Sequence, residues 1–515
     1  MKRKQYIIPF ATLIVALFIA ASCSKNLDVL PENRTYTGGT DYTQTSDMIK
    51  TVIGMYSKLS VVDNEWADYP IISVRGDDVN AGGLGDQPGI AATDMYNYSK
   101  IEWSYNALWQ DYYQHLFDSQ SALEQIELYK ASASTSIDAT ANQYSAEVKV
   151  LEAWWLFQLS RVWGTVYIPT SSNPSTLFDT PLSNKDEVMQ HISVLMDEAI
   201  PFLPALRPNE RTDIPGGVTK YTALAMKALA NLELGKYQDV ATATGEIINS
   251  GKFVLESDYY NLFKIKGKLN NENLLEKQYS DLGQASGTNY YYLMAFFGPQ
   301  GWTPKVAGSG DGWGFFEPSL KYIKFMLDRG ETTRLQTSVL FTNRGIAEIK
   351  TDTKYATLPS WISNTTPSGD IINDFAREMF VSGKHYLPSD QLTPGRTAYG
   401  TNKNFTCIRY AEILLMYAEA LTQGATGTAG TADDAVNLVR TRAGLASITG
   451  VDTDKVMAEK YAELAMEWGT RFYDMVRLGK TDELSYDGRT YTADKQFLPY
   501  PQNQVDILPA LGAAK

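Results

Sequence analysis

Paired helices constrain the fold of this chain more than any other sequence feature. In several segments apolar side chains recur every three or four residues, which is the spacing of one face of an α-helix. Most of these segments come in pairs, so each helix can bury its apolar face against its neighbour. The expected helices cover residues 47–60, 105–129, 141–162, 185–200, 219–234, 237–248, 406–421, 431–443 and about 454–478.

The clearest pair is 219–234 with 237–248. Thr219 is a typical N-cap for the first helix, and Gly235 is a typical stop at its end. Gly444 ends the helix 431–443 in the same way. A helix, a short turn and a second helix resemble a tetratricopeptide unit, in which small residues let the helices cross closely. Here those small residues are Ala223, Ala225, Ala228 and Ala230.

Between the helices lie long segments without helical period, and they are rich in Gly, Pro, Asn and Tyr. Binding residues are found disproportionately in such loops. We therefore expect a mainly α fold in which tetratricopeptide-like helix pairs form a scaffold, covered by a large irregular, loop-rich region that carries the ligand face. The expected single domain spans 23–515, with scaffold segments at about 41–60, 105–249 and 406–478, the irregular binding region at about 61–104 and 250–400, and a further irregular segment at 480–515.

The N-terminus has the pattern of an export signal. Lys2, Arg3 and Lys4 precede an apolar run at 7–20, which is shorter than the ~20 residues of a membrane-spanning helix. Ala20, Ala21 and Ser22 then lead into Cys23 and resemble a bacterial lipobox. We expect a lipoprotein signal peptide over 1–22 and acylation of Cys23, with several chains giving stable anchoring. The alternative is an ordinary signal peptide followed by a chance cysteine.

Charge and cysteine content exclude some functions. The net charge of −13 disfavours nucleic acid as a partner, because nucleic-acid binding needs a basic surface. Cys407 is the second of only two cysteines, so we expect no disulfide framework and interpret Cys407 as a small buried apolar residue.

Motifs for catalysis, metals and cofactors are absent from the sequence. The three histidines, His115, His191 and His385, are far apart and none belongs to a His-Glu-x-x-His zinc motif. No Gly-x-Ser-x-Gly nucleophile motif occurs. We therefore expect no catalytic residues, no metal and no cofactor.

Long motifs resemble one family. The stretches are 409–420 (RYAEILLMYAEA), 435–445 (AVNLVRTRAGL) and 463–477 (ELAMEWGTRFYDMVR), and together they resemble the SusD/RagB family of Bacteroidetes lipoproteins. Shorter features agree, and the resemblance covers nearly the whole chain after Cys23. These features are Leu27-Asp28 with Pro31, Asp77-Asp78, 154–157 (WWLF) before Gly164, and 497–501 (FLPYP).

The resemblance implies a function and partners. SusD-like proteins bind oligosaccharides at the cell surface and cap a SusC-like TonB-dependent transporter, so both become expected partners here. The expected location is the outer membrane, with a lipid anchor and an outward-facing domain. The outward orientation depends on the resemblance, because Ser24, Lys25 and Asn26 lack the acidic cluster often linked to surface export. One alternative is a peptide cargo, as in RagB-like members, and another is a lipid-anchored glycoside hydrolase.

A sugar site needs exposed aromatic planes and polar groups that bond hydroxyls. Two loop segments offer that mixture, and Trp313 between two glycines is the best single candidate for a stacking platform. The alternative is that many of the aromatics fill a second core and that Asp77-Asp78 is a structural element. The first segment supplies Tyr290, Tyr291, Tyr292, Trp302 and Trp313, and the second supplies Arg75, Asp77, Asp78, Asn80, Tyr96, Tyr98 and Trp103.

Carboxylates on the expected last helix allow two interpretations. Glu463 and Glu467 are four residues apart, as are Glu467 and Arg471, and Asp474 and Arg477 are three apart. Glu463 and Glu467 as the acid and base of a glycosidase would be the catalytic interpretation. We favour a structural charge network, because such networks imitate catalytic clusters. Glu412 and Glu419 with Arg440 and Arg442 are interpreted in the same way.

Overall fold

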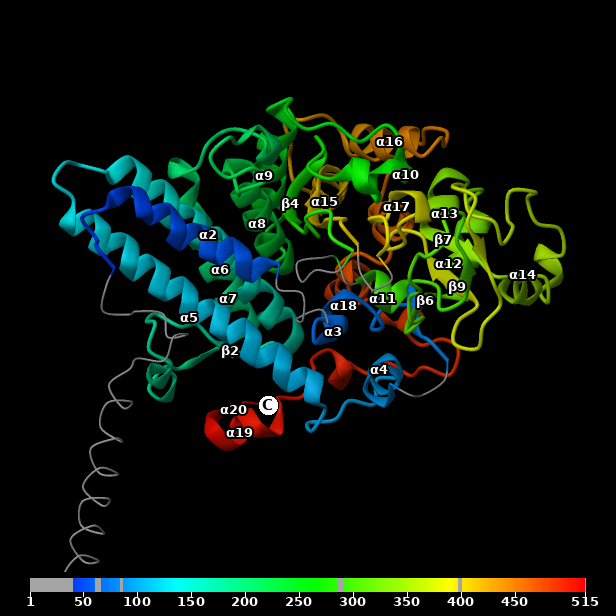
Figure 1. Cartoon of the computed structure of the whole chain (residues 1–515), viewed down its shortest axis with the longest axis horizontal. Helices are drawn as coiled ribbons and strands as arrows, with labels where there is room; N and C mark the ends of the chain where they lie inside the picture. The colour runs from blue at the N-terminus through cyan, green and yellow to red at the C-terminus, as the bar shows by residue number, and fades with distance from the viewer. Residues whose placement is uncertain are drawn as a thin grey trace, which may run out of the picture.

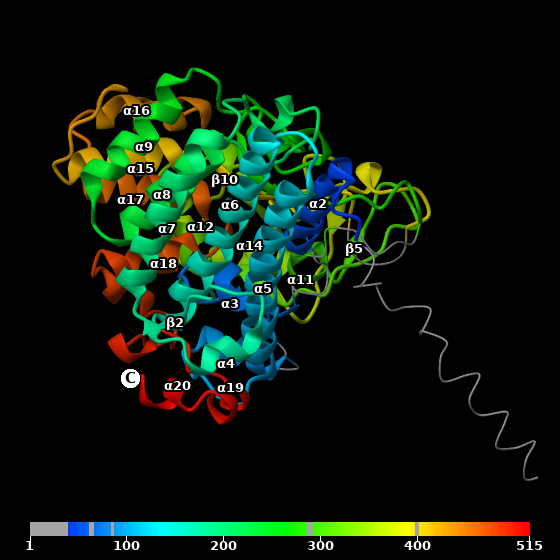
Figure 2. The same ribbon diagram turned by 90° about the vertical axis from the view of Figure 1, so that its left-hand side faces the viewer.

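Long helices form a continuous stack on one side of the molecule (Figures 1 and 2). The computed structural model describes residues 40–60, 66–83, 87–285, 291, 293–396 and 401–514. The expected signal peptide and Cys23 lie outside these residues. Neighbouring helices in the sequence pack side by side, and α9 then packs on α15. The helices are α2 (Met48–Leu59), α5 (Trp103–Ser132), α6 (Asp138–Trp163), α7 (Lys185–Ala199), α8 (Lys220–Glu233), α9 (Tyr237–Asn249), α15 (Tyr410–Thr422), α16 (Ala432–Arg442) and α17 (Thr453–Leu464).

The predicted mainly helical scaffold is confirmed. In α6 every residue from Val150 to Trp163 is buried, because α5, α7 and α2 all pack against this helix. The alanines of α8 are fully buried, as expected for a close crossing. Thr219 is the N-cap of α8, and Gly235 follows that helix with φ of +66°, which glycine adopts readily.

A strand replaces the first turn of the helix expected from residue 406. β10 (Phe405–Arg409) pairs antiparallel with β4 (Asn273–Lys277), and α15 begins only at Tyr410. Cys407 lies in β10 and is buried, as predicted. Pairing with a distant strand has overridden the local helical pattern, so the prediction was wrong at this boundary.

The expected last helix is broken in two. α17 ends at Leu464, and α18 (Thr470–Arg477) begins after Gly469. The backbone N–H of Met466 donates to the Asp78 carboxylate at 2.7 Å, and Gly469 N–H donates to the carbonyl of Ile72 at 3.1 Å. Contacts with segment 72–78 therefore divert the chain, and the prediction of one continuous helix was wrong.

The irregular region contains more regular structure than the sequence indicated. Its helices have at most nine residues, too few to display a clear period. Absence of helical structure was therefore a wrong prediction for parts of 61–104, 250–400 and 480–515. The short helices are α3 (Tyr69–Ile72), α4 (Pro88–Asp94), α10 (Tyr259–Leu262), α11 (Leu293–Phe297), α12 (Leu320–Asp328), α13 (Thr333–Ser338), α14 (Asn343–Ile349), α19 (Gln502–Ile507) and α20 (Ala510–Ala513).

Small two-stranded sheets connect the loops by backbone hydrogen bonds. All pairs are antiparallel, and most connect segments far apart in the sequence. The pairs besides β4–β10 are β1 (Val79–Ala81) with β6 (Phe316–Pro318), β2 (Val166–Tyr167) with β3 (Leu182–Ser183), β5 (Trp302–Thr303) with β8 (Ile371–Ile372), and β7 (Val339–Phe341) with β9 (Phe380–Ser382).

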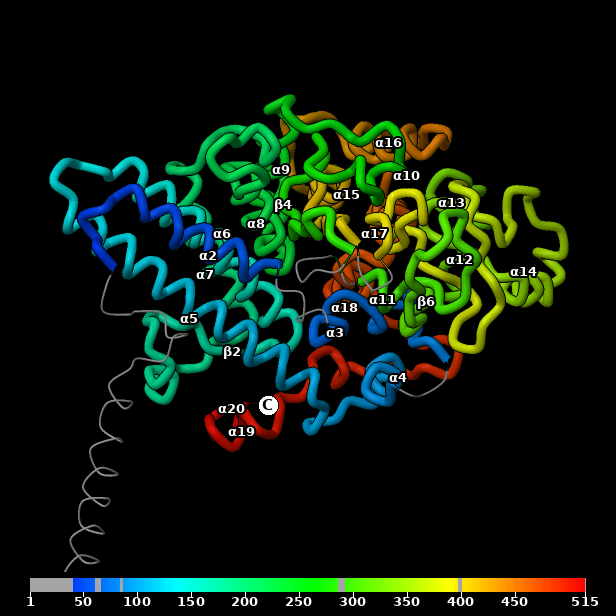
Figure 3. The backbone as a smooth tube through the Cα atoms, in the orientation of Figure 1, coloured from blue at the N-terminus to red at the C-terminus, as the bar shows by residue number. Residues whose placement is uncertain are grey.

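The C-terminal segment returns to the beginning of the fold (Figure 3). Arg489 binds the carboxylate of Asp94 in α4, with Nε and Oδ1 2.7 Å apart. Leu498 N–H donates to the carbonyl of Val162 at 2.9 Å. The C-terminal segment therefore packs back on α4 and on the end of α6. Within the described ranges, no helix combines the length and apolarity needed to cross a membrane.

A buried charge network joins the stack to the irregular region. Arg409 in β10 contacts Glu463 at 2.6 Å, Glu467 at 2.8 Å and Glu272 at 2.9 Å. Lys384 from the irregular region also binds Glu467, at 2.7 Å. Burial alone would favour the neutral form of the Glu467 carboxyl, but Arg409 and Lys384 hold its pKa below the ordinary value. The structure thus confirms a charge network around these carboxylates.

Several residues of the expected ion pairs bind other partners. Arg471 binds Asp77 at 2.7 Å rather than Glu467. Glu419 binds Lys460 and Arg477, both at 2.6 Å, rather than an arginine of α16. The expected pair Asp474–Arg477 is present at 2.6 Å. Two further arginines join the network as Arg440–Glu459, at 3.1 Å, and Arg442–Glu463.

We expect Glu467→Ala to lower the melting temperature strongly. Removal of this carboxylate leaves the charges of Arg409 and Lys384 partly uncompensated in the interior, which costs about 3–5 kcal/mol. The matched control is Glu127→Ala, because Glu127 pairs with Lys130 at the surface and should cost less than about 1 kcal/mol. Differential scanning calorimetry of both variants checks this, and equal melting temperatures would contradict the network's role.

Candidate functional site

Strand pairing joins parts of the two predicted binding segments. β1 and β6 align Val79 with Pro318 and Ala81 with Phe316. Just beyond them, Gly82 N–H donates to the carbonyl of Phe315 at 2.7 Å. Residues 79–82 therefore lie beside residues 315–318, next to the loop of Trp313.

Asp77 and Asp78 anchor the site from inside. Asp77 is fully buried and accepts from Arg471 at 2.7 and 3.1 Å, with Lys321 also at 2.7 Å. Asp78 accepts the Met466 N–H, and burial raises its pKa to about 6. Neither carboxylate faces solvent, so the structure favours the structural interpretation of this pair over contact with a ligand.

The other residues of the second segment point to different places. Asn80 is half-buried and its Oδ1 accepts from the Tyr486 hydroxyl at 2.5 Å. Tyr96 is buried against Phe472, and Tyr98 accepts from Arg75 Nε at 3.2 Å. Trp103 is 57% exposed at the start of α5. These side chains form no common face.

Two aromatics of the first segment belong to the core. Tyr291 is buried, with its ring 6.0 Å from that of Tyr279. Trp302, in β5, is 7% exposed and meets Tyr386 edge-on at 6.0 Å. Both support the alternative of a second core beneath the loops. Tyr290 and Tyr292 lie outside the described residues.

Trp313 belongs to an aromatic cluster made of Trp66, Phe296, Trp313 and Phe315, which we call the aromatic face. The Trp66 and Trp313 rings lie 5.1 Å apart and are tilted by 35°. Both tryptophans are half-buried, whereas the two phenylalanines are buried beneath them. The aromatic face thus consists of two indole rings that pack on two buried phenylalanine rings.

Backbone contacts hold the loop of Trp313 rigidly. Trp313 N–H donates to the carbonyl of Ala295 at 2.5 Å, and Phe315 N–H donates to that of Phe296 at 2.8 Å. A Cβ on Gly312 would overlap the backbone of Gly298. Gly312 therefore permits the close approach of two backbones that keeps the loop of Trp313 in place.

Sequence reasoning missed Trp66, Phe375 and Arg377. The guanidinium carbon of Arg377 lies 5.0 Å from the centre of the Phe315 ring. Phe375 is half-buried against Gly301 and Gly314. Trp66 carried the same signal as Trp313, since it is an aromatic residue in a segment without helical period.

A buried carboxyl lies beneath this cluster. Glu378 is 1% exposed, and neither of its carboxyl oxygens has a hydrogen-bond partner in the described structure. A Cβ on Gly314 would lie 3.0 Å from Glu378 Cδ, which places the carboxyl beside the loop of Trp313. Burial, together with neighbouring Glu317, raises the pKa of Glu378 well above its ordinary value despite Arg377.

Among the described residues, no group of His, Cys, Asp or Glu side chains has the arrangement of a metal site. The chemistry available at the aromatic face is therefore apolar contact by two indoles, with the charge of Arg377 beside them. This combination suits a ligand with flat apolar surfaces and polar edges.

We expect Glu378→Gln to stabilise the protein increasingly as pH rises from 5 to 8. In this pH range the Glu378 carboxyl stays protonated in the folded state but is ionised in the unfolded chain. This group therefore lowers the free energy of unfolding of the wild type by at most about 1.4 kcal/mol for each pH unit of increase. Melting temperatures across this pH range, with Glu127→Gln as control, measure the difference. Parallel profiles for wild type and Glu378→Gln would contradict the assignment.

Comparison with known proteins agrees on one family. The sequence model of the SusD family matches residues 271–511, and a second model, described as starch-binding associating with outer membrane, matches residues 87–229. A SusD-like protein of Bacteroides ovatus is 23% identical, over 90% of this chain and 80% of its own length. SusD-like protein P2 of Formosa agariphila is also 23% identical, over 93% and 92%.

Solved structures share the fold. The surface glycan-binding protein A from Bacteroides fluxus superposes with a TM-score of 0.73 at 22% identity, covering 90% of this chain and 96% of its own. The same-named protein from Bacteroides thetaiotaomicron, in complex with laminarihexaose, gives 0.72 at 22% identity over 90% and 98%. With its helical scaffold, its loop-rich covering region and both sequence models in agreement, the chain belongs to the SusD family.

Proposed function

We propose that this protein is a cell-surface glycan-binding lipoprotein that captures oligosaccharides and delivers them to a SusC-like TonB-dependent transporter. The observation that carries the proposal is the half-buried pair of Trp66 and Trp313, whose rings lie 5.1 Å apart. Two similar structures support a glycan cargo, since one contains laminarihexaose and another is described as a laminarin-binding SusD-like protein.

The geometry of the aromatic face fits a sugar chain. The C–H faces of a pyranose ring pack on an indole, and the 35° tilt between Trp66 and Trp313 suits two successive sugars of a curved chain. Arg377 brings N–H donors close to this surface for hydroxyl groups. Two platforms give a Kd on the order of micromolar to millimolar, which permits release to a transporter.

Trp313→Ala should weaken oligosaccharide binding about tenfold or more. This corresponds to a loss of about 1.4 kcal/mol and reflects one lost stacking platform. Trp66→Ala should have a similar effect, whereas exposed Trp103 at the start of α5 provides the matched control Trp103→Ala. Isothermal titration with laminarihexaose, and affinity electrophoresis on a panel of polysaccharides, measure the change, with circular dichroism as the folding check.

Each outcome of this comparison discriminates between sites. Unchanged affinity in both Trp313→Ala and Trp66→Ala, with weaker binding by Trp103→Ala, would move the site to the end of α5. Collapse of the helical circular dichroism in Trp313→Ala would assign that indole to the core. Retained binding of peptides without any binding of glycans would favour the RagB-like alternative.

A lipid-anchored glycoside hydrolase is a weaker alternative. Its two carboxyls would be Glu463 and Glu467, but both are buried and bound by Arg409. Burial opposes ionisation, yet Arg442, Arg409 and Arg334 together hold the pKa of Glu463 far below the range of a general acid. Incubation with the glycans that bind, followed by a reducing-end assay, should give no new ends.

The proposal includes attachment to the outer membrane, on its outer side, through acylated Cys23. The description of the second family model, which names association with the outer membrane, supports this location. The sequence before Cys23 supports the anchor, because basic, apolar and small residues occur in the order of a lipoprotein signal.

Cys23→Ala should abolish lipidation, because the Cys23 thiol is the proposed acyl acceptor. We expect the variant to leave the detergent phase in Triton X-114 partitioning and to lose incorporation of radiolabelled palmitate. Ser22→Thr, which keeps a small side chain before the cysteine, is the control. Palmitate incorporation by Cys23→Ala at the wild-type level would contradict the anchor.

A further inference from the structure

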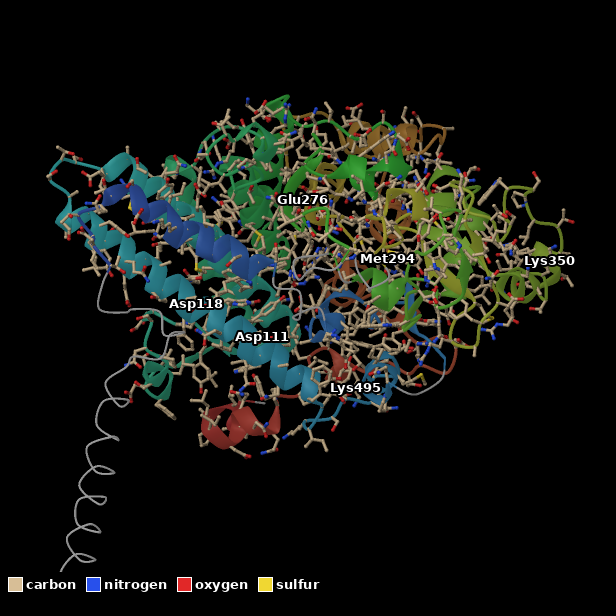
Figure 4. All side chains as sticks on the ribbon, in the orientation of Figure 1. Asp111, Asp118, Glu276, Met294, Lys350 and Lys495 are labelled. Atoms are coloured by element: carbon tan, nitrogen blue, oxygen red, sulfur yellow. The ribbon has the colours of Figure 1, made fainter. Side chains whose placement is uncertain are left out.

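A small cavity behind β10 is surrounded by basic side chains. Its lining includes Lys264, Lys268, Lys384, His385 and Lys403, with Glu276 and Glu467 as the acidic members. The cavity offers about 20 Å³ to the centre of a water-sized sphere, which is room for one or two species of that size. Figure 4 labels Glu276 near the middle of the molecule.

Two of the lysines have unused hydrogen-bond donors. An ammonium group carries three N–H donors. Lys264 Nζ donates to the carbonyls of Gly383 at 2.7 Å and Tyr386 at 3.0 Å, and Lys403 Nζ donates to the carbonyl of Lys384. Within the described structure Lys264 therefore has one N–H left and Lys403 has two. Both side chains are buried, at 1% and 5% exposure.

The carboxylates around the cavity do not balance its positive charge. Glu467 is already bound by Arg409 and by Lys384. Glu276 accepts from Leu269 N–H at 2.9 Å and from amide groups, and burial raises its pKa to about 7. Among the described residues, neither Lys264 nor Lys403 forms an ion pair with a carboxylate.

Contacts with aromatic rings compensate only part of the positive charge of the two lysines. Lys403 Nζ lies 4.8 Å from the centre of the Tyr291 ring, and Lys264 Nζ lies 4.5 Å from that of Tyr260. Such contacts are favourable but leave the ammonium groups uncompensated. A buried ammonium without a carboxylate partner either loses its proton or is joined by a counter-ion.

We propose that the cavity between Lys264 and Lys403 binds one small monovalent anion of chloride size. The anion accepts the unused N–H donors of both lysines and compensates their charge. It also fits the volume, which excludes organic anions such as gluconate. Burial lowers the pKa of both lysines, that of Lys403 to about 7 although Glu467 opposes the shift, and a bound anion favours their charged forms.

Bromide provides the direct test, because it replaces chloride and scatters X-rays anomalously. Crystals of the wild-type protein without its signal peptide, soaked in sodium bromide, should show an anomalous peak in the cavity within hydrogen-bond distance of Lys264 Nζ and Lys403 Nζ. Bromide peaks at the surface only, with none in the cavity, would overturn the proposal.

Thermal stability provides the second test. At equal ionic strength, the wild-type melting temperature should be higher in sodium chloride or bromide than in sodium gluconate by about 2 °C or more, and the rise should saturate with chloride concentration. Lys403→Met should lose this dependence on chloride. Its melting temperature in gluconate should equal or exceed that of wild type, because the unpaired charge is gone.

The matched control is Lys350→Met. Lys350 is exposed at the end of α14, far from Glu276 in Figure 4, and this variant should keep the wild-type response to chloride. If Lys403→Met fails to fold, Lys403→Gln and the wild-type bromide crystals decide the question. Equal wild-type melting temperatures in chloride and gluconate, or a response unchanged by Lys403→Met, would overturn the proposal.

Discussion

The guanidinium of Arg409 is the contact on which the arrangement of this molecule depends. It joins Glu272 before β4, Glu463 at the end of α17 and Glu467 in the turn toward α18. Hydrophobic burial can hold such elements together at many angles, whereas a buried guanidinium with several carboxylates accepts few geometries. Lys384 extends the contact into the loop-rich region, so the scaffold and its covering share one set of charges.

The aromatic face benefits from this rigidity. Asp77 on Arg471 and Asp78 on the Met466 N–H fix the chain just before β1. β1 pairs with β6, and β6 follows directly after the loop of Trp313. A stacking platform must keep its orientation before the ligand arrives, and support by packed elements achieves this at low entropic cost. The position of the Trp313 loop therefore depends in part on two carboxylates that are buried in the interior.

Local signals in the sequence predicted the scaffold but not the contacts between distant segments. The helices around Ala223 and Trp155 followed from spacing and caps, because their burial is decided within a pair of neighbours. The strand at Cys407 and the break at Met466 could not be predicted, since a partner strand and the Asp78 carboxylate reach them from far away in the sequence. For the candidate site, the glycine neighbours of Trp313 made it a candidate, and that role stays a prediction. Its partner Trp66, and the burial of Trp302, depend on tertiary packing that no local pattern encodes.

The return of the C-terminal segment has a consequence for how the chain acquires its structure. Helices α5 to α9 pack on sequence neighbours, so they can associate early, whereas Asp77 and Asp78 find partners far later in the sequence, in Lys321, Tyr461, Met466 and Arg471. Contacts of such long sequence separation form late and slowly. The first loops therefore stay open until nearly the whole polypeptide has emerged. Under the proposed export this order would keep the chain able to thread through a channel, because its fold closes last at the end that leaves last.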